Sequence, residues 1–162
     1  AIRLPVSLIE QIEQMQERAQ EPTVTEVMHP LQTSEVALPL YMVAVSAGLP
    51  APAEDYIEDK IDLNQHLIRN AAATFLVRAT GDSMIGAGIH SGDVLVVDRS
   101  IEPTQNKIVI AVLNGNLTVK RIRYERKRVY LLPENPDYPA IAINEGIELQ
   151  VWGVVTNVIH SV

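Results

Sequence analysis

Six short runs rich in β-branched residues follow one another along the chain and constrain its fold more than any other feature. They cover residues 75–80, 93–98, 107–113, 117–124, 129–133 and 149–159, and Gly, Pro or Asn residues separate them. Val, Ile and Thr suit the half-buried surface of a pleated sheet, so this pattern is typical of short strands joined by turns. Asn114-Gly115 lies between two runs and favours a tight hairpin, because both residues tolerate positive φ. The sequence predicts a small, mainly β domain of short antiparallel strands.

The chain ahead of these runs has a different pattern. Apolar residues recur at spacings of three and four in residues 7–20, and Ser7 with Glu10 forms a capping box, which together predict a short amphipathic helix. The proline-rich stretch that begins at Leu38 favours extended backbone, whereas residues 59–70 favour a second short helix. We therefore expect a flexible N-terminal arm containing a short helix ahead of the β domain.

Composition excludes several classes of protein. The chain has 162 residues, of which 47% are hydrophobic, so it can bury the core of one domain. Its apolar runs are shorter than the roughly 18 residues of a spanning helix, and it opens without a secretion signal, so we expect a cytoplasmic protein without a membrane segment. Cysteine is absent, which excludes disulfides and thiolate chemistry. The histidines at positions 29, 66, 90 and 160 show no paired spacing, so no metal site is predicted. No cofactor is expected either.

The charge is unevenly distributed. The net charge is −7, yet residues 120–128 hold six of the 13 basic residues. The overall acidity argues against general nucleic-acid binding, which depends on clustered positive charge. We interpret the basic segment as the solvated end of a hairpin, with contact to a polyanion as the alternative.

Two residues could carry chemistry as a pair, although each is weak evidence alone. Ser83 follows the first predicted strand in the motif TGDSM, and Lys120 lies on the strand after the Asn-Gly turn. A serine hydroxyl needs a base to become a good nucleophile, and a neutral lysine amine can act as that base. The amine becomes neutral when an apolar pocket excludes water from it. Strand alternation places Lys120 on the same face as Thr118 and Ile122.

These residues belong to a set of motifs that resembles the LexA/UmuD family of self-cleaving serine-lysine peptidases, and the UmuD branch more closely. The motifs occur in family order from about residue 38 to the end of the chain. They are SAGLPAPAEDY at 46–56, IDLN at 61–64, TGDSMI at 80–85, SGD at 91–93, VD at 97–98, LTVK at 117–120 and WGVV at 152–155.

The resemblance implies a peptidase that cuts its own chain. Ser83 would be the nucleophile, Lys120 the general base, and Ala47-Gly48 the bond that is cut. Residues 1–47 would then be an arm removed by self-cleavage, and residues 48–162 a mainly β serine-lysine peptidase domain. Gly48 also fits a cut site on physical grounds, because it lets another backbone approach without a β-carbon clash.

The resemblance also implies partners. In the UmuD-like interpretation, RecA filaments stimulate the cut during the SOS response to DNA damage, and the processed homodimer joins a UmuC-like error-prone polymerase subunit. No sequence-specific DNA binding is expected, because residues 1–47 carry six acids and two bases and are shorter than a helix-turn-helix domain of roughly 60 residues. Two alternatives stay open: a LexA-like repressor inactivated by self-cleavage, and a non-catalytic β module in which Ser83 is a turn residue.

Overall fold

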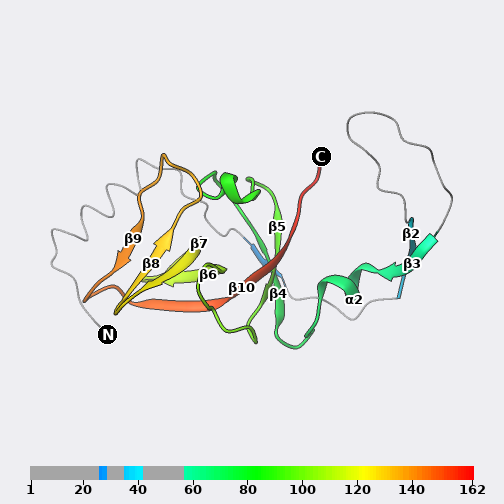
Figure 1. Cartoon of the computed structure of the whole chain (residues 1–162), viewed down its shortest axis with the longest axis horizontal. Coiled ribbons are helices and arrows are strands. Elements are labelled where there is room, and N and C mark those ends of the chain that lie inside the picture. The colour runs from blue at the N-terminus through cyan, green and yellow to red at the C-terminus, as the bar shows by residue number, and fades with distance from the viewer. Residues whose placement is uncertain (1–25, 29–34, 42–56) are drawn as a thin grey trace. The chain divides into compact units, whose positions relative to one another are not determined.

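The computed structural model describes residues 26–28, 35–41 and 57–162 (Figure 1). The helix predicted over residues 7–20 lies outside the described residues. The chain divides into two compact units, one formed by residues 31–69 and the other by the rest of the chain. In the part of the chain that the structure describes, no helix has the length and apolar character needed to cross a membrane.

The larger unit is built on a single antiparallel sheet of eight strands, in the order β1-β4-β5-β10-β6-β7-β8-β9. In chain order the strands are β1 (Glu26–Met28), β4 (Thr74–Arg78), β5 (Val94–Asp98), β6 (Ile108–Leu113), β7 (Asn116–Glu125), β8 (Arg128–Leu132), β9 (Ile141–Ile143) and β10 (Leu149–Ile159). The mainly β fold and all six predicted strands are confirmed, within two residues at each end. The sequence pattern did not predict β1 and β9, which have three residues each.

Two tight hairpins occur where the sequence indicates turns. Asn114 and Gly115 have φ values of 48° and 89° and connect β6 to β7, as predicted from the Asn-Gly pair. Arg126, with a φ of 53°, begins the two-residue turn between β7 and β8. Residues 123–128 are exposed, so the interpretation of the basic segment as the solvated end of a hairpin is confirmed for these residues, whereas it is wrong for Lys120, which is 0% exposed.

The longest strand connects the two halves of the sheet. The first part of β10 pairs with β6 and its second part pairs with β5 (Figure 1). The buried residues form two clusters, and β6 contributes to both. Ile110 belongs to the cluster that contains Phe75, whereas Val109 and Ala111 belong to the cluster that contains Leu131. This division follows from strand alternation, which points successive side chains of β6 to opposite faces.

The smaller unit contains the exposed hairpin of β2 (Ala37–Tyr41) and β3 (Ile57–Asp62), followed by helix α2 (Leu63–Leu67). Residues 38–41 have the extended backbone that was predicted from Leu38, and residues 42–56 of that stretch lie outside the described residues. The helix predicted over residues 59–70 is wrong in its first part, because residues 59–62 belong to β3. The helix begins only after Asp62, whose carboxylate accepts hydrogen bonds from the backbone N–H groups of Asn64 and Gln65 and so acts as its N-cap.

Candidate active site

The loop that follows β4 buries Ser83 inside the larger unit. Gly81 has a φ of 81° and turns the chain just after β4. The Ile85 N–H then donates to the Asp82 carbonyl at 3.2 Å, and a single 3-10 turn, η1 (Ile85–Ala87), follows. The predicted turn is therefore present. The serine within it is 0% exposed, which a solvated turn residue would not be.

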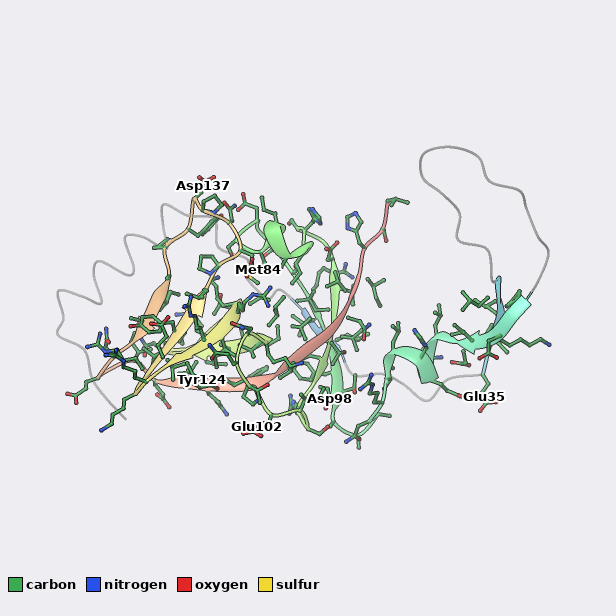
Figure 2. The ribbon with its side chains drawn as sticks, viewed as in Figure 1. Glu35, Met84, Asp98, Glu102, Tyr124 and Asp137 are labelled. Carbon is green, nitrogen blue, oxygen red and sulfur yellow. The ribbon has the colours of Figure 1, made fainter. Side chains whose placement is uncertain are left out.

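Met84 anchors this loop in the core. Its side chain, which Figure 2 labels, is 1% exposed and belongs to the same buried cluster as Phe75 and Leu95. Burial of a methionine contributes about 1.5–3 kcal/mol relative to leaving it exposed. The residue beside Ser83 thus holds the loop against the sheet, as a packing residue.

The connection between β8 and β9 also holds the loop. The Glu134 N–H donates to the Ser83 carbonyl at 2.8 Å, and Asn135 Nδ2 donates to the Asp82 carbonyl at 3.1 Å. The Tyr138 hydroxyl donates to the Asp82 carboxylate. These contacts fix the backbone at Ser83 and at the residue before it. Sequence reasoning missed the three contacting residues, because no motif relates their segment to TGDSM.

Lys120 reaches the site from the sheet. It lies in the middle of β7, and the register of the sheet pairs it with Val109 of β6. Both residues are 0% exposed. The strand face predicted from alternation is confirmed, because Thr118 on the same face contacts the amine. Val109, the apolar partner on β6, helps to shield the lysine from water. The sequence alone did not show whether Lys120 is buried.

The structure brings Ser83 and Lys120 together. Lys120 Nζ lies 3.1 Å from Ser83 Oγ, 2.9 Å from Thr118 Oγ1 and 3.2 Å from the Val119 carbonyl oxygen. The first distance is within hydrogen-bond range, so a proton can pass directly between hydroxyl and amine. Burial disfavours the charged form of a lysine amine. Ala47 and Gly48, the residues of the predicted cut, lie outside the described residues.

Comparison with protein families shows the family to which the chain belongs. A family model described as peptidase S24-like matches residues 39–156, which is well over half of the chain and includes both Ser83 and Lys120. The chain belongs to the peptidase S24-like family. As a peptidase S24-like chain, it is a self-cleaving serine peptidase.

Individual relatives place the chain within the family. Over 123 residues, 76% of this chain and 85% of the relative, it is 50% identical to protein SamA of Salmonella typhimurium (strain LT2). It is 45% identical to protein ImpA of Escherichia coli over 122 residues, 75% of this chain and 83% of the relative. The LexA repressor of Paracidovorax citrulli (strain AAC00-1) is 34% identical over 128 residues, which are 79% of this chain but 56% of the repressor.

These matches decide between the two peptidase interpretations. The LexA match is weaker, and it leaves almost half of the repressor without a counterpart in the match. This S24-like chain is therefore a UmuD-like member of the LexA/UmuD family. Its function is an accessory role in SOS mutagenesis, as the sequence predicted, in preference to the repressor alternative.

Proposed function

We propose that this chain cuts its own Ala47-Gly48 bond with Ser83 as the nucleophile and Lys120 as the general base. The observation that carries the proposal is the 3.1 Å contact between Lys120 Nζ and Ser83 Oγ, with both side chains fully buried. A solvated lysine is protonated at neutral pH and cannot accept a proton. A buried amine in contact with a hydroxyl is the arrangement that a serine-lysine mechanism requires.

The contacts of Lys120 suit a neutral amine. A neutral amine has two N–H protons and one lone pair. Thr118 Oγ1 at 2.9 Å and the Val119 carbonyl oxygen at 3.2 Å can accept the two protons. The lone pair is then available to the hydroxyl proton of Ser83, so the same contacts that satisfy the amine also orient it as a base.

The chemistry has two steps. Lys120 Nζ takes the hydroxyl proton as Ser83 Oγ attacks the carbonyl carbon of Ala47, and the protonated amine then gives that proton to the leaving nitrogen of Gly48. This breaks the peptide bond and leaves residues 1–47 as an ester on Ser83. Water, deprotonated by the same amine, then hydrolyses the ester to a free carboxylate at Ala47 and restores the serine. Backbone N–H groups beside Ser83 would stabilise the oxyanion that forms in each step.

Cleavage divides the chain into an arm of residues 1–47 and a processed form of residues 48–162. We propose that the processed form acts as a homodimer on a UmuC-like error-prone polymerase subunit, and that a RecA filament stimulates the cut. The family resemblance supports both partners. RecA would act by shifting the population of chains toward the state in which the bond at Ala47 is docked at Ser83.

The test is mass spectrometry of the full chain after incubation at pH about 7 and pH about 10. Because alkali deprotonates lysine, cleavage should accelerate at the higher pH and give fragments that end at Ala47 and begin at Gly48. Ser83→Ala and Lys120→Ala should each abolish both fragments. Lys120→Arg should also fail, because a guanidinium stays protonated.

Matched controls separate catalysis from folding. Ser91→Ala and Lys107→Ala alter exposed residues of the same types and should cleave like the wild type. Circular dichroism should show that every variant keeps the β fold. Brisk alkaline cleavage in a folded Ser83→Ala or Lys120→Ala variant would contradict the assigned role, and fragments at another bond would contradict the cut site.

A further inference from the structure

The antiparallel pairing of β5 with β10 places the start of β5 beside the end of β10. The last pair of this antiparallel ladder is Val94 with Ile159. The residue before β5 is Asp93, and the residue after β10 is His160. Continuing the register by one position therefore places these two residues opposite each other, although they are 67 positions apart in the sequence.

A tight turn adds a second histidine to the same place. The Asp93 N–H donates to the His90 carbonyl at 3.1 Å, and Gly92, with a φ of 96°, supplies the positive φ within the turn. In return, the His90 N–H donates to Asp93 Oδ2 at 2.7 Å. The two reciprocal hydrogen bonds fix His90 beside the carboxylate. The sequence predicted no pairing among the histidines, and this prediction is wrong for His90 and His160.

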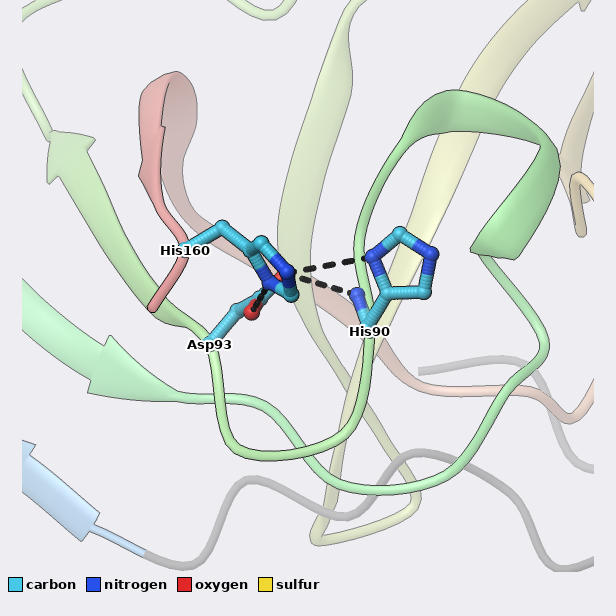
Figure 3. Close-up of side chains that lie close together, drawn as sticks. All are labelled: His90, Asp93 and His160. Carbon is cyan, nitrogen blue, oxygen red and sulfur yellow. Dashed lines mark hydrogen bonds and ion pairs between the residues drawn. The ribbon is translucent and has the colours of Figure 1, made fainter. Parts of the chain in front are cut away.

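The three side chains face one another at the surface (Figure 3). His160 Nδ1 lies 2.6 Å from Asp93 Oδ1, and His90 Nδ1 lies 3.8 Å from Asp93 Oδ2. The two imidazole rings have centroids 5.1 Å apart. One donor atom from each residue lies within 4.8 Å of the other two. The Asp93 side chain is only 3% exposed, whereas His90 and His160 are 52% and 48% exposed, so the carboxylate is fixed and the rings are open to solvent.

We propose that His90, Asp93 and His160 bind a divalent transition-metal ion of the zinc class. Two imidazole nitrogens and one carboxylate oxygen form a donor set that suits zinc, nickel and copper better than calcium or magnesium, which prefer oxygen ligands. Metal–ligand bonds of about 2.0–2.2 Å require donor atoms closer than 4.8 Å, which small rotations of the exposed rings can achieve. Three protein ligands leave a fourth tetrahedral position for water.

The ion would take the place of the hydrogen between Asp93 and His160. When Nδ1 of His160 binds the ion, the neutral imidazole carries its single N–H proton on Nε2, so the step releases no proton from the neutral ring. The ion would then tie the end of β10 to the turn that precedes β5. That turn follows the Ser83 loop directly in the chain, so the site braces the segment that carries the buried serine. The metal site itself does not depend on the proposed peptidase mechanism.

Equilibrium dialysis of the full chain with Zn²⁺ at pH about 7.5 tests the proposal. We expect one ion per chain in the wild type, and an affinity lower by on the order of tenfold or more in His90→Ala and in His160→Ala. His66→Ala removes an exposed histidine of α2 and should bind like the wild type. Co²⁺ should give the visible absorption of a tetrahedral site in the wild type and in His66→Ala only.

Thermal unfolding provides a readout that is independent of activity. An ion that binds the folded chain alone raises its melting temperature, and the rise grows with the concentration of free ion. Zn²⁺ should therefore raise the Tm of the wild type and of His66→Ala, and raise the Tm of His90→Ala and His160→Ala much less at the same concentration of free ion. Zn²⁺ binding that survives both substitutions, or no binding at millimolar Zn²⁺, would overturn the proposal and leave a hydrogen-bonded His–Asp–His cluster.

Discussion

At Gly86 the backbone of the Ser83 loop packs directly against the β8–β9 connection. A β-carbon at this position would lie 2.4 Å from the Glu134 carbonyl oxygen. That oxygen accepts the Gly86 N–H at 2.7 Å, and the Glu134 N–H in turn donates to the Ser83 carbonyl. A side chain at Gly86 would therefore push on the same residue that holds the backbone of Ser83.

We predict that Gly86→Ala destabilises the fold and slows self-cleavage. Overpacking of this kind costs about 1–3 kcal/mol in the free energy of unfolding, measured by urea denaturation. Gly88→Asn is the matched control, because Gly88 has a φ of 76°, which asparagine tolerates, and a β-carbon there would meet no atom of the described residues within 4 Å. The explanation fails if the two variants are equally stable and cleave equally fast.

The sequence predicted that Ser83 and Lys120 lie close together, which the structure shows, but not which residues hold them in place. Ser83 and Lys120 each lie in a motif, and serine chemistry without a histidine partner suggests a lysine base. Asn135 contacts Asp82 across 53 positions of sequence, and no local pattern encodes such a contact. Burial of Lys120 could not be predicted from local sequence either, because it depends on which strands pair with β7.

The structural elements that follow local patterns were predicted well. Strand alternation and turn residues act over a few positions, so the hairpin at Asn114 could be recognised from sequence. The boundary between β3 and α2 could not. Asp62 accepts the Val36 N–H at 2.7 Å from 26 positions away, and Ile61 pairs with Leu38 of β2. These contacts hold residues 57–62 in a strand, so the helix begins only at Leu63.

We predict that α2 and the β2–β3 hairpin weaken together at acidic pH. Hydrogen bonds from the backbone N–H groups of Val36, Gln65 and Asn64 outweigh desolvation and hold the pKa of Asp62 below the ordinary value of 3.8. The carboxylate therefore stabilises these elements fully above its unfolded pKa, and the contribution is lost as the pH falls through the lowered pKa. Amide chemical shifts of the three donor residues should report this titration.

Asp62→Asn is the control for this prediction, because its side chain does not titrate in that range. In this variant the amide shifts of Asn64 and Gln65 should no longer change over the same interval of pH. A midpoint above 3.8 in the wild type would contradict the assigned hydrogen bonds.

At the scale of the whole molecule, strand β10 joins the two buried clusters into one folded unit. The sequence predicted the full length of β10 but not its neighbours, because the order of strands in a sheet depends on contacts between distant segments. The register shifts where β10 changes partner, between Val151 and Gly153 and again between Val155 and Asn157. Such irregularities bend a strand, which lets one strand serve both halves of the sheet.

Gly153 permits the close packing at this bend. A β-carbon there would lie 2.8 Å from Val97 Cγ1 and 3.0 Å from the Asp98 carbonyl oxygen. Because Val97 belongs to one cluster and Val154 to the other, this contact lies where the two clusters meet along β10. Strain at Gly153 should therefore destabilise both clusters, and we expect the two clusters to unfold in one transition.

We predict that Gly153→Ala lowers the free energy of unfolding by about 1–3 kcal/mol. Trp152 fluorescence and far-ultraviolet circular dichroism should give the same urea midpoint, since fluorescence reports the contact with Phe75 and circular dichroism reports the sheet.

A double variant tests whether Val97 is the residue that clashes. Val97→Ala alone should lower the free energy of unfolding by on the order of 2 kcal/mol, because it leaves a cavity. The double variant should be less destabilised than the sum by at least about 0.5 kcal/mol, because the alanine at 97 removes the clashing methyl group. Recovery should be partial, since the Asp98 carbonyl remains in place. Strict additivity, or separate midpoints for the two probes, would show that β10 does not couple the two clusters through this contact.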